Sequence, residues 1–139
     1  HSVTQRLEFW KAALGVIRSH PLFGTGTGDL KEAYQAEYER MGTQLRPEFR
    51  LRAHNQYLTF GVAFGIPGMA FLIFVLAWLL VQSWKKENLL MAVFLVIAAI
   101  SFLNEDTLET QAGVTFFAFL CGFLWRYSER TVEEKQVIQ

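Results

Sequence analysis

The stretch Tyr57–Trp84 (YLTFGVAFGIPGMAFLIFVLAWLLVQSW) decides the fold, because none of its 28 residues is charged. A helix needs about 20 predominantly apolar residues to cross a hydrocarbon core of about 30 Å. We therefore predict a membrane-spanning helix over residues 57–84. Two further apolar runs, residues 88–104 and 111–126, predict a second and a third span. The third is so short that it needs either snorkelling side chains at its ends or a locally thinned bilayer. The predicted fold class is all-α, a polytopic membrane protein with residues 57–127 as its transmembrane region.

Charge is segregated along the chain. Of 13 basic and 13 acidic residues, eight basic and six acidic ones lie within residues 1–54, whereas residues 55–84 carry none. Together with 52% hydrophobic residues, this is the composition of a membrane protein with one polar region. A nucleic-acid-binding protein needs an excess of basic residues, and the net charge here is zero. We therefore expect no nucleic acid among the partners.

The short loops predict the orientation of the spans. Five basic residues follow the first and the last span: Lys85, Lys86, Arg126, Arg130 and Lys135. The connector of residues 104–111 contains no Lys or Arg, and cytoplasmic loops carry the excess of basic residues. We therefore expect the Lys-Lys turn and a tail of residues 128–139 in the cytoplasm, and residues 1–56 with the connector on the outer face.

The polar region of residues 1–56 is predicted to contain two amphipathic helices. In the first, Ser2 and Gln5 have the spacing of a capping box. Pro21 should end this helix near His20, because the residue before a proline is pushed out of the helical conformation. Its apolar stripe follows from spacings of three and four: Leu7, Trp10, Leu14 and Ile17.

The second helix is expected to run from Asp29 to about Met41. Asp29 and Glu32 again have capping-box spacing, and Gly42 supplies a C-terminal stop. Tyr34 and Tyr38 lie four residues apart and share one face. They either pack on the first helix or rest on the membrane surface.

A glycine-rich segment, Pro21–Gly28, separates the two helices. It lacks the Gly-Lys-Ser/Thr ending of a Walker loop, and a tight turn is the favoured interpretation. Backbone amides just before the helix start at Asp29 leave an anion nest as the minor alternative.

Candidate chemistry gathers where the polar region meets the first span. Arg50, Arg52 and His54 alternate onto one face of a strand, and in a helix Arg50 and His54 share a face. A histidine, with a reference pKa of ~6.5, can act as a base toward a hydroxyl, above all when a carboxylate orients its far nitrogen. The alternative is an interfacial histidine without chemistry. The arginines suit a diphosphate, because a guanidinium grips two oxygens at once, or alternatively lipid headgroups.

The expected topology brings further charges to the same outer face: Arg6, Arg46, Glu105, Asp106 and Glu109. The three acids can orient His54, pair with the arginines, hold a divalent ion or simply be solvated. The histidines show no metal-ligand spacing, so we expect neither a metal nor a cofactor.

The chain opens with His1-Ser2-Val3, without the pattern of a signal peptide. We therefore expect it to be a fragment cut from a longer protein. Its one cysteine, Cys121, lies in an apolar run and is interpreted as a buried hydrophobic residue.

Three motifs in order resemble the O-antigen ligase and O-antigen polymerase superfamily. The first pairs Arg6 with Trp10, and the second is the turn Pro21-Leu22-Phe23-Gly24-x-Gly26. The third is His54-Asn55-x-Tyr57-Leu58, followed by Gly65-Ile66-x-Gly68. The resemblance covers residues 2–82 by motif and the rest of the chain by topology.

The resemblance implies a GT-C-like, multi-pass glycosyltransferase of the bacterial inner membrane, with residues 1–56 in the periplasm. Such enzymes transfer a glycan from an undecaprenyl-diphosphate carrier to an acceptor hydroxyl, without a metal or a nucleotide sugar. His54 matches the family's essential histidine, the candidate base, and Arg6 matches its loop arginine, which binds the diphosphate. Arg50 and Arg52 are added as substrate-binding candidates from their location alone. Asn55 is expected to steer His54 or the sugar.

The implied partners are the lipid-linked glycan, an acceptor glycolipid or glycan, and the lipid bilayer. Family members have more spans than this chain, so the resemblance implies that the chain is the C-terminal portion of such a protein, and the fragment alone is expected to be inactive. Ligase-type transfer is the first hypothesis, and an O-antigen polymerase or a protein O-oligosaccharyltransferase is the alternative within the family. A non-enzymatic membrane transporter or structural subunit is the alternative of another class, and a soluble helical bundle is a third.

Overall fold

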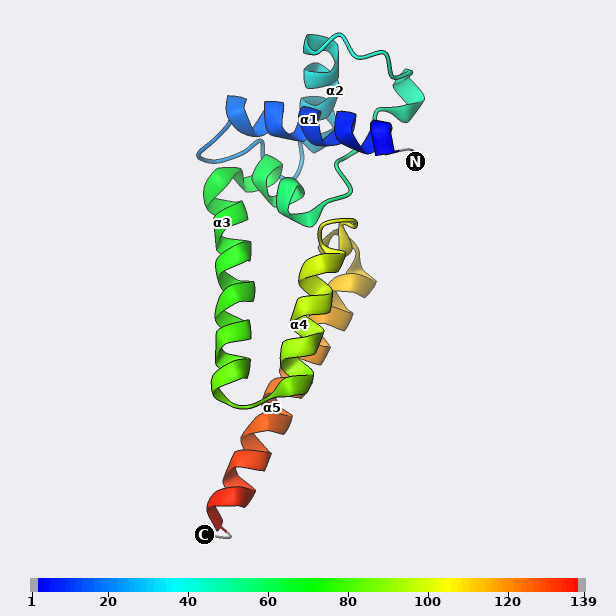
Figure 1. The fold of residues 1–139 in the computed structure, drawn as a ribbon. Coiled ribbons are helices and arrows are strands. Elements are labelled where there is room, and N and C mark those ends of the chain that lie inside the picture. Colours follow the sequence, from blue (N-terminus) through cyan, green and yellow to red (C-terminus); the bar gives the residue numbers. More distant parts are fainter. Residues whose placement is uncertain (1–2, 138–139) are drawn as a thin grey trace. The chain divides into compact units, whose positions relative to one another are not determined.

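The computed structural model describes the backbone of residues 3–137 and the side chains of residues 4–127. Every regular element in this part of the chain is a helix (Figure 1). In chain order they are α1 (Val3–Ser19), α2 (Leu30–Arg40), the 3₁₀ turn η1 (Pro47–Phe49), α3 (Gln56–Lys85), α4 (Leu89–Ser101), the 3₁₀ turn η2 (Thr107–Glu109) and α5 (Gln111–Val137). The predicted all-α class is confirmed for the described residues.

The chain divides into two compact units. The first unit comprises residues 1–73 and 103–106, and the second comprises residues 74–102 and 107–139. Helix α3 therefore begins in one unit and ends in the other.

Helix α1 packs across α2 and forms the core of the first unit (Figure 1). The buried face of α1 consists of Phe9, Ala12, Ala13, Val16 and Ile17. The predicted stripe was wrong for Leu7 and Leu14, which are 51% and 44% exposed. The choice of face follows from small side chains, because a Cβ added to Gly15 would overlap the carboxylate of Glu37 on α2. The missing side chain at Gly15, beside Ala12 on the same face, lets α1 and α2 approach closely at this point.

Tyr34 and Tyr38 of α2 are buried in this core, so the prediction that they pack on the first helix is confirmed. The Tyr38 hydroxyl donates a hydrogen bond to the backbone oxygen of Leu51, at 2.7 Å. Burial raises the pKa of both phenols above their ordinary range, because desolvation penalises the charged phenolate. The hydrogen bond ties the segment that precedes α3 to α2.

The ends of the helices match local signals with one exception. Helix α1 ends at Ser19, just before the His20-Pro21 pair, and α2 stops before Gly42, whose φ is +59°. Asp29 is the residue before α2, but with ψ at 12° its side chain makes no capping hydrogen bond. That capping box was wrongly predicted, because a cap needs extended backbone to aim the carboxylate at the helix amides. The cap predicted at Ser2 lies outside the described residues.

Helix α3 bends at Gly65, where φ is 72° and ψ is −171°. Two residues later Pro67 has no backbone N–H, so the carbonyl of Ala63 lacks its usual helical donor. Gly26 supplies that donor, since its N–H bonds to the Ala63 oxygen at 2.9 Å. The loop that contains Gly26 therefore replaces the hydrogen bond that the bend removes from the Ala63 carbonyl.

The Pro21–Gly26 loop makes two further backbone bonds to the bend. The Thr25 N–H donates to the Val62 oxygen at 2.8 Å, and the Ile66 N–H donates to the Pro21 oxygen at 2.8 Å. The glycine-rich segment is thus a turn, as predicted. The backbone amides of residues 25 and 26 donate to carbonyl oxygens of α3. They therefore cannot form the anion nest that was the minor alternative.

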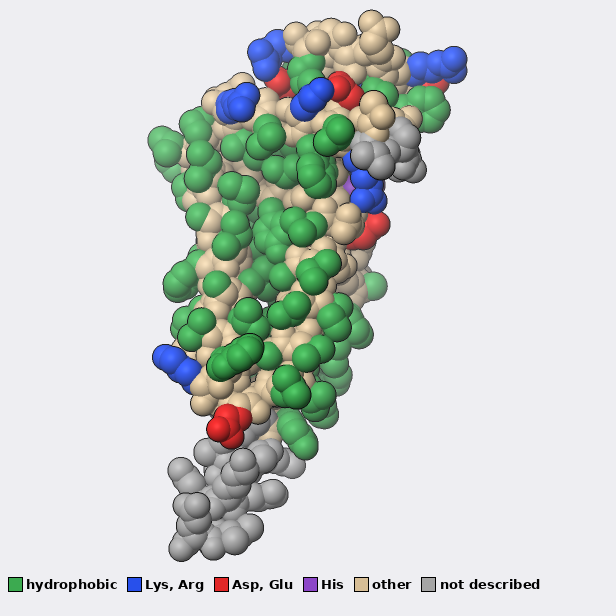
Figure 2. Space-filling view, in the orientation of Figure 1, with side chains coloured by type: hydrophobic (Ala, Val, Ile, Leu, Met, Phe, Trp, Pro, Cys, Tyr) green, Lys and Arg blue, Asp and Glu red, His purple; other side chains and the backbone are tan. Residues whose placement is uncertain are grey.

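Aromatic side chains join the helices of the second unit. Phe94 of α4 lies 5.7 Å from Phe117 of α5 between ring centroids, and Trp78 of α3 stacks on Trp125 of α5 at 6.0 Å. The Asn88 side chain accepts a hydrogen bond from the Met91 N–H and so caps α4. Outside these contacts the helices expose large apolar side chains, which Figure 2 shows gathered over α3 and α4.

Among the described residues, α3 is the one helix long and apolar enough to cross a membrane. Its bounds agree with the predicted span to within one residue at each end. Helix α4 is apolar but has 13 residues, or roughly 20 Å at 1.5 Å per residue. The prediction of three spans therefore stays a prediction.

Candidate functional site

The site begins with an irregular segment, residues 50–55, that leads into α3. His54 within it has a φ of +46°. A side chain other than glycine is uncommon in this left-handed region, where histidine is among the enriched residues. Such strain persists only where surrounding contacts hold it, and it gathers at functional sites. The contacts around His54 therefore decide whether this residue belongs to a functional site.

Asp106 is the acidic partner of His54. Its Oδ2 lies 4.0 Å from Nδ1 of His54 and 3.8 Å from Nε of Arg52. The Asp106 side chain is only 6% exposed, whereas those of His54 and Arg52 are 34% and 47% exposed. Both distances are those of ion pairs and exceed the usual hydrogen-bond range. We call these three residues the His54–Asp106–Arg52 cluster.

Asn55 fixes the backbone on the far side of His54. Its Nδ2 donates to the backbone oxygen of Leu103 at 3.1 Å, and its Oδ1 accepts from the Leu58 N–H at 3.1 Å. The residue is 4% exposed. Both ends of the amide thus hold protein groups: one caps α3 and the other anchors the segment that contains Asp106.

Helix α1 contributes the two residues of the Arg-x-x-x-Trp motif. Arg6 donates from Nη1 to Oδ1 of Asn104 at 3.0 Å, and Trp10 donates from Nε1 to the backbone oxygen of Ala53 at 3.0 Å. Residues four apart share one face of a helix. This face therefore holds residue 53, next to His54, and residue 104, close to Asp106.

The remaining predicted arginines, Arg50 and Arg46, contact groups outside the His54–Asp106–Arg52 cluster. Arg50 donates from Nε to the Leu45 oxygen at 3.2 Å. The Arg46 guanidinium lies 3.9 Å from the Glu48 carboxylate, with both side chains exposed. Of the three connector acids, Asp106 is buried and Glu105 and Glu109 are exposed. The described residues contain no group of three or more metal-ligating side chains arranged to hold an ion.

Sequence reasoning missed Leu103 and Asn104. Both follow the apolar run of α4, and only the polar side chain of Asn104 could have drawn attention. No local pattern predicts that the Leu103 carbonyl accepts from Asn55, because that bond joins residues 48 positions apart.

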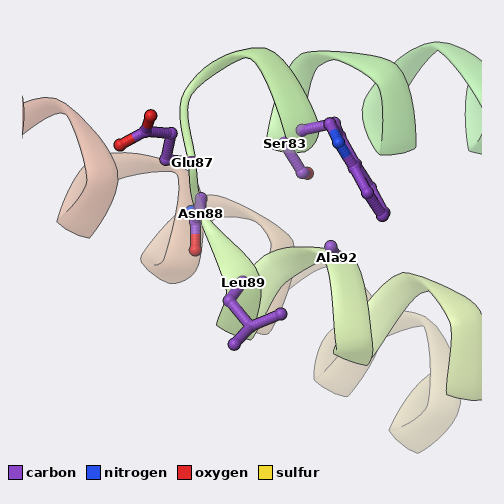
Figure 3. Close-up of a pocket in the computed structure, with 6 residues that line it drawn as sticks. Ser83, Glu87, Asn88, Leu89 and Ala92 are labelled. Atoms are coloured by element: carbon purple, nitrogen blue, oxygen red, sulfur yellow. The ribbon is translucent and has the colours of Figure 1, made fainter.

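A pocket of about 190 Å³ lies in the second unit at the turn between α3 and α4 (Figure 3). It is lined by Ser83, Trp84, Glu87, Asn88, Leu89 and Ala92. The Ser83 hydroxyl donates to the Leu79 oxygen, and Asn88 donates from Nδ2 to the Leu124 oxygen. The Ser83 hydroxyl is thus engaged within α3, and the Asn88 amide ties the turn to α5. None of the predicted site residues lines the pocket.

The sequence profile described as O-antigen ligase matches residues 1–73. The chain belongs to the O-antigen ligase family. This confirms the resemblance, and it indicates a membrane protein of polysaccharide biosynthesis with glycosyltransferase activity of the O-antigen ligase or polymerase type. No curated protein and no solved structure matched the chain.

The O-antigen ligase match contains the candidate residues on α1 and before α3, together with the Pro21–Gly26 loop. It ends at residue 73 and so leaves out Leu103–Asp106. Asp106 lies outside the matched stretch, so its assignment to the site rests on the predicted topology and on the geometry of this structure.

Proposed function

We propose that this O-antigen ligase family chain acts in the transfer of a glycan from an undecaprenyl-diphosphate carrier to an acceptor hydroxyl, with His54 as the base. One observation carries the proposal. His54, held in a left-handed conformation at the head of α3, lies at ion-pair distance from a buried carboxylate. Its position falls within the stretch that matches the family.

In this reaction the acceptor oxygen attacks the anomeric carbon of the glycan, and its proton passes to the imidazole of His54. The bond between that carbon and the carrier diphosphate breaks, and the diphosphate leaves. Asp106 stabilises the imidazolium that forms, as an orienting carboxylate does for other histidine bases. Nε2 of His54 is buried in this conformation, so an acceptor reaches it only after a neighbouring side chain moves.

The leaving diphosphate needs positive charge, and the arginines supply it without a metal. Arg52 is the first candidate, because it shares the Asp106 carboxylate with His54 and is half exposed. Arg6 is the second, because it holds Asn104 two residues from Asp106. Arg50 stays a weaker candidate, since its Nε is engaged by the Leu45 carbonyl. Asn55, whose amide is occupied at both ends, positions His54 in this proposal and does not bind the sugar.

The proposal includes the membrane topology. Residues 1–56 lie in the periplasm and residues 128–139 lie in the cytoplasm. Helices α3 and α4 and the part of α5 up to residue 127 span the bacterial inner membrane. The length and composition of α3 and its exposed apolar side chains support this arrangement, as does the basic Lys85-Lys86 turn.

The test replaces His54 with asparagine at the native locus. Asparagine tolerates the left-handed backbone, so His54→Asn removes the imidazole without adding strain. The matched control is His20→Asn, which changes an exposed histidine of the same unit. We expect His54→Asn to be produced normally, to abolish glycan transfer and to accumulate the lipid-linked glycan, whereas His20→Asn transfers normally.

Normal transfer by His54→Asn would contradict the proposal and favour a non-enzymatic transporter or structural subunit. The product that disappears in the variant distinguishes the alternatives within the family. A ligase loses the glycan on its acceptor glycolipid, a polymerase loses chain length on the carrier, and a protein O-oligosaccharyltransferase loses glycosylated protein.

A further inference from the structure

The tip of the Pro21–Gly26 loop exposes two large apolar side chains. Leu22 is 65% exposed and Phe23 is 86% exposed, the highest value among the large hydrophobic side chains described. The loop does not hang loose, because three backbone hydrogen bonds hold it to α3 at Val62, Ala63 and Ile66. A Cβ at Gly65 would lie 2.6 Å from the Pro21 oxygen, so the contact is a close one. The exposed tip is therefore fixed at one level of α3.

The exposure of side chains along the first part of α3 shows that the loop tip lies where this helix leaves the packed first unit. Before the bend the helix is covered by the first unit: Gln56 is 0% exposed, Thr59 is 2% and Val62 is 0%. After the bend Ile66 is 50% exposed and Phe71 is 64% exposed. The apolar side chains of α3 thus change from mostly buried to mostly exposed around the bend, from Phe64 onward, although Leu72 stays buried.

Length places the hydrocarbon boundary at the same residue. The first charge after the bend is Lys85, and Gly65–Trp84 is a run of 20 residues. At 1.5 Å per residue this run spans about 30 Å, the thickness of the hydrocarbon core. The predicted span from residue 57 therefore shortens to start at the bend, level with the docked loop.

The loop itself carries no charge that would oppose insertion. Between Arg18 and Asp29 there is no Asp, Glu, Lys or Arg. Near the tip, Phe64 and Ile66 of α3 are also 44% and 50% exposed. Exposed apolar side chains that adjoin one another mark an interaction surface, and the adjoining surface of α3 is the one proposed to face lipid.

We infer that the Leu22–Phe23 tip inserts into the outer leaflet of the bilayer beside α3 and fixes the depth of the first unit, which holds His54, relative to the membrane. The inference rests on the proposed membrane topology of α3. It gives a physical reason why the loop motif and the Gly65-Ile66-Pro67-Gly68 motif occur together. The loop motif supplies the membrane anchor, and the second motif supplies the bend of α3 to which the loop is hydrogen-bonded.

The test attaches a spin label to single cysteines in a Cys121→Ala background and measures relaxation by oxygen, which enters lipid, and by a nickel chelate, which stays in water. The protein is reconstituted into vesicles of phosphatidylethanolamine and phosphatidylglycerol. Phe23→Cys is the probe, exposed Thr27→Cys in the same segment is the water control, and Phe71→Cys on α3 is the bilayer control. We expect positions 23 and 71 to be relaxed by oxygen and position 27 by nickel.

Two results would overturn the inference while the membrane span stands. A label at position 23 relaxed by nickel would place the tip in water, and a label shielded from both reagents would show that another protein segment covers it. A label at position 71 relaxed by nickel would contradict the span of α3, and with it both proposals.

Discussion

Asn55 donates a hydrogen bond from its side chain to the backbone oxygen of Leu103, at 3.1 Å and across 48 residues of chain. Asn55 directly follows His54, and Leu103 lies three residues before Asp106. This bond therefore joins the two halves of the candidate site, together with the bonds from Arg6 to Asn104 and from Trp10 to Ala53. The same side chain caps α3 through Oδ1, so one buried amide contributes both to the start of α3 and to the position of the imidazole relative to its carboxylate.

We predict that Asn55→Asp and Asn55→Ala both lower glycan transfer by about tenfold, the equivalent of one hydrogen bond of roughly 1.4 kcal/mol. Asn55→Asp keeps the oxygen that caps α3 but turns a second acceptor toward the Leu103 carbonyl. Asn55→Ala loses both bonds and should also lower the thermal unfolding midpoint. Transfer assayed in membranes and unfolding followed in detergent separate the two effects. Full activity of Asn55→Asp would show that the bond to Leu103 is dispensable.

Asp106 should matter to catalysis, and its neighbour should not. We predict that Asp106→Asn lowers transfer by about 10²-fold, the lower end of what a positioned base contributes, because the imidazolium loses its counter-charge. Exposed Glu105→Gln is the control and should keep the wild-type rate. An Asp106→Asn enzyme that transfers glycan at the wild-type rate would mean that the carboxylate does not act on His54.

The sequence predicts well whatever is decided locally. Absence of charge defined α3 to within one residue at each end, and Pro21 and Gly42 marked the ends of α1 and α2. The buried face of α1 was not predictable in this way, because apolar residues occur on both faces and the packing of Gly15 on Glu37 decides between them.

In the candidate site, too, the sequence predicted the local grouping of residues but not the contacts between distant parts of the chain. Alternation along the chain grouped Arg52 with His54, and the structure joins them through Asp106. Which of three nearby acids would be buried depended on contacts made by Arg6 and Asn55 to residues 103 and 104. Such long-range hydrogen bonds leave no periodic trace in the sequence.

Gly24 and Gly26 form a matched pair for testing the docked loop. Both have positive φ, 65° and 81°, so alanine at either position adds a strain of about 1–2 kcal/mol. At Gly24 the added Cβ would also overlap the backbone of Ala63 and Phe64, whereas at Gly26 it meets nothing within 4 Å. We therefore predict that Gly24→Ala lowers the unfolding midpoint and the amount of protein in the membrane far more than Gly26→Ala. Equal effects would show that the loop is not packed on the bend of α3.

The buried tyrosines predict a loss of stability at alkaline pH. Burial raises the pKa of Tyr34 and Tyr38 in the folded protein above the value near 10 of an unfolded chain. The folded state then keeps protons that the unfolded state gives up, so their contribution is complete below about pH 10 and falls as the pH rises further, by up to about 1.4 kcal/mol per pH unit for each tyrosine. Thermal unfolding in detergent between pH 8 and 11 measures this slope. Tyr34→Phe should reduce it, while Tyr127→Phe, which changes an exposed tyrosine, should not. If the slope survives in a Tyr34→Phe, Tyr38→Phe double variant, then groups outside the core between α1 and α2 set the alkaline limit.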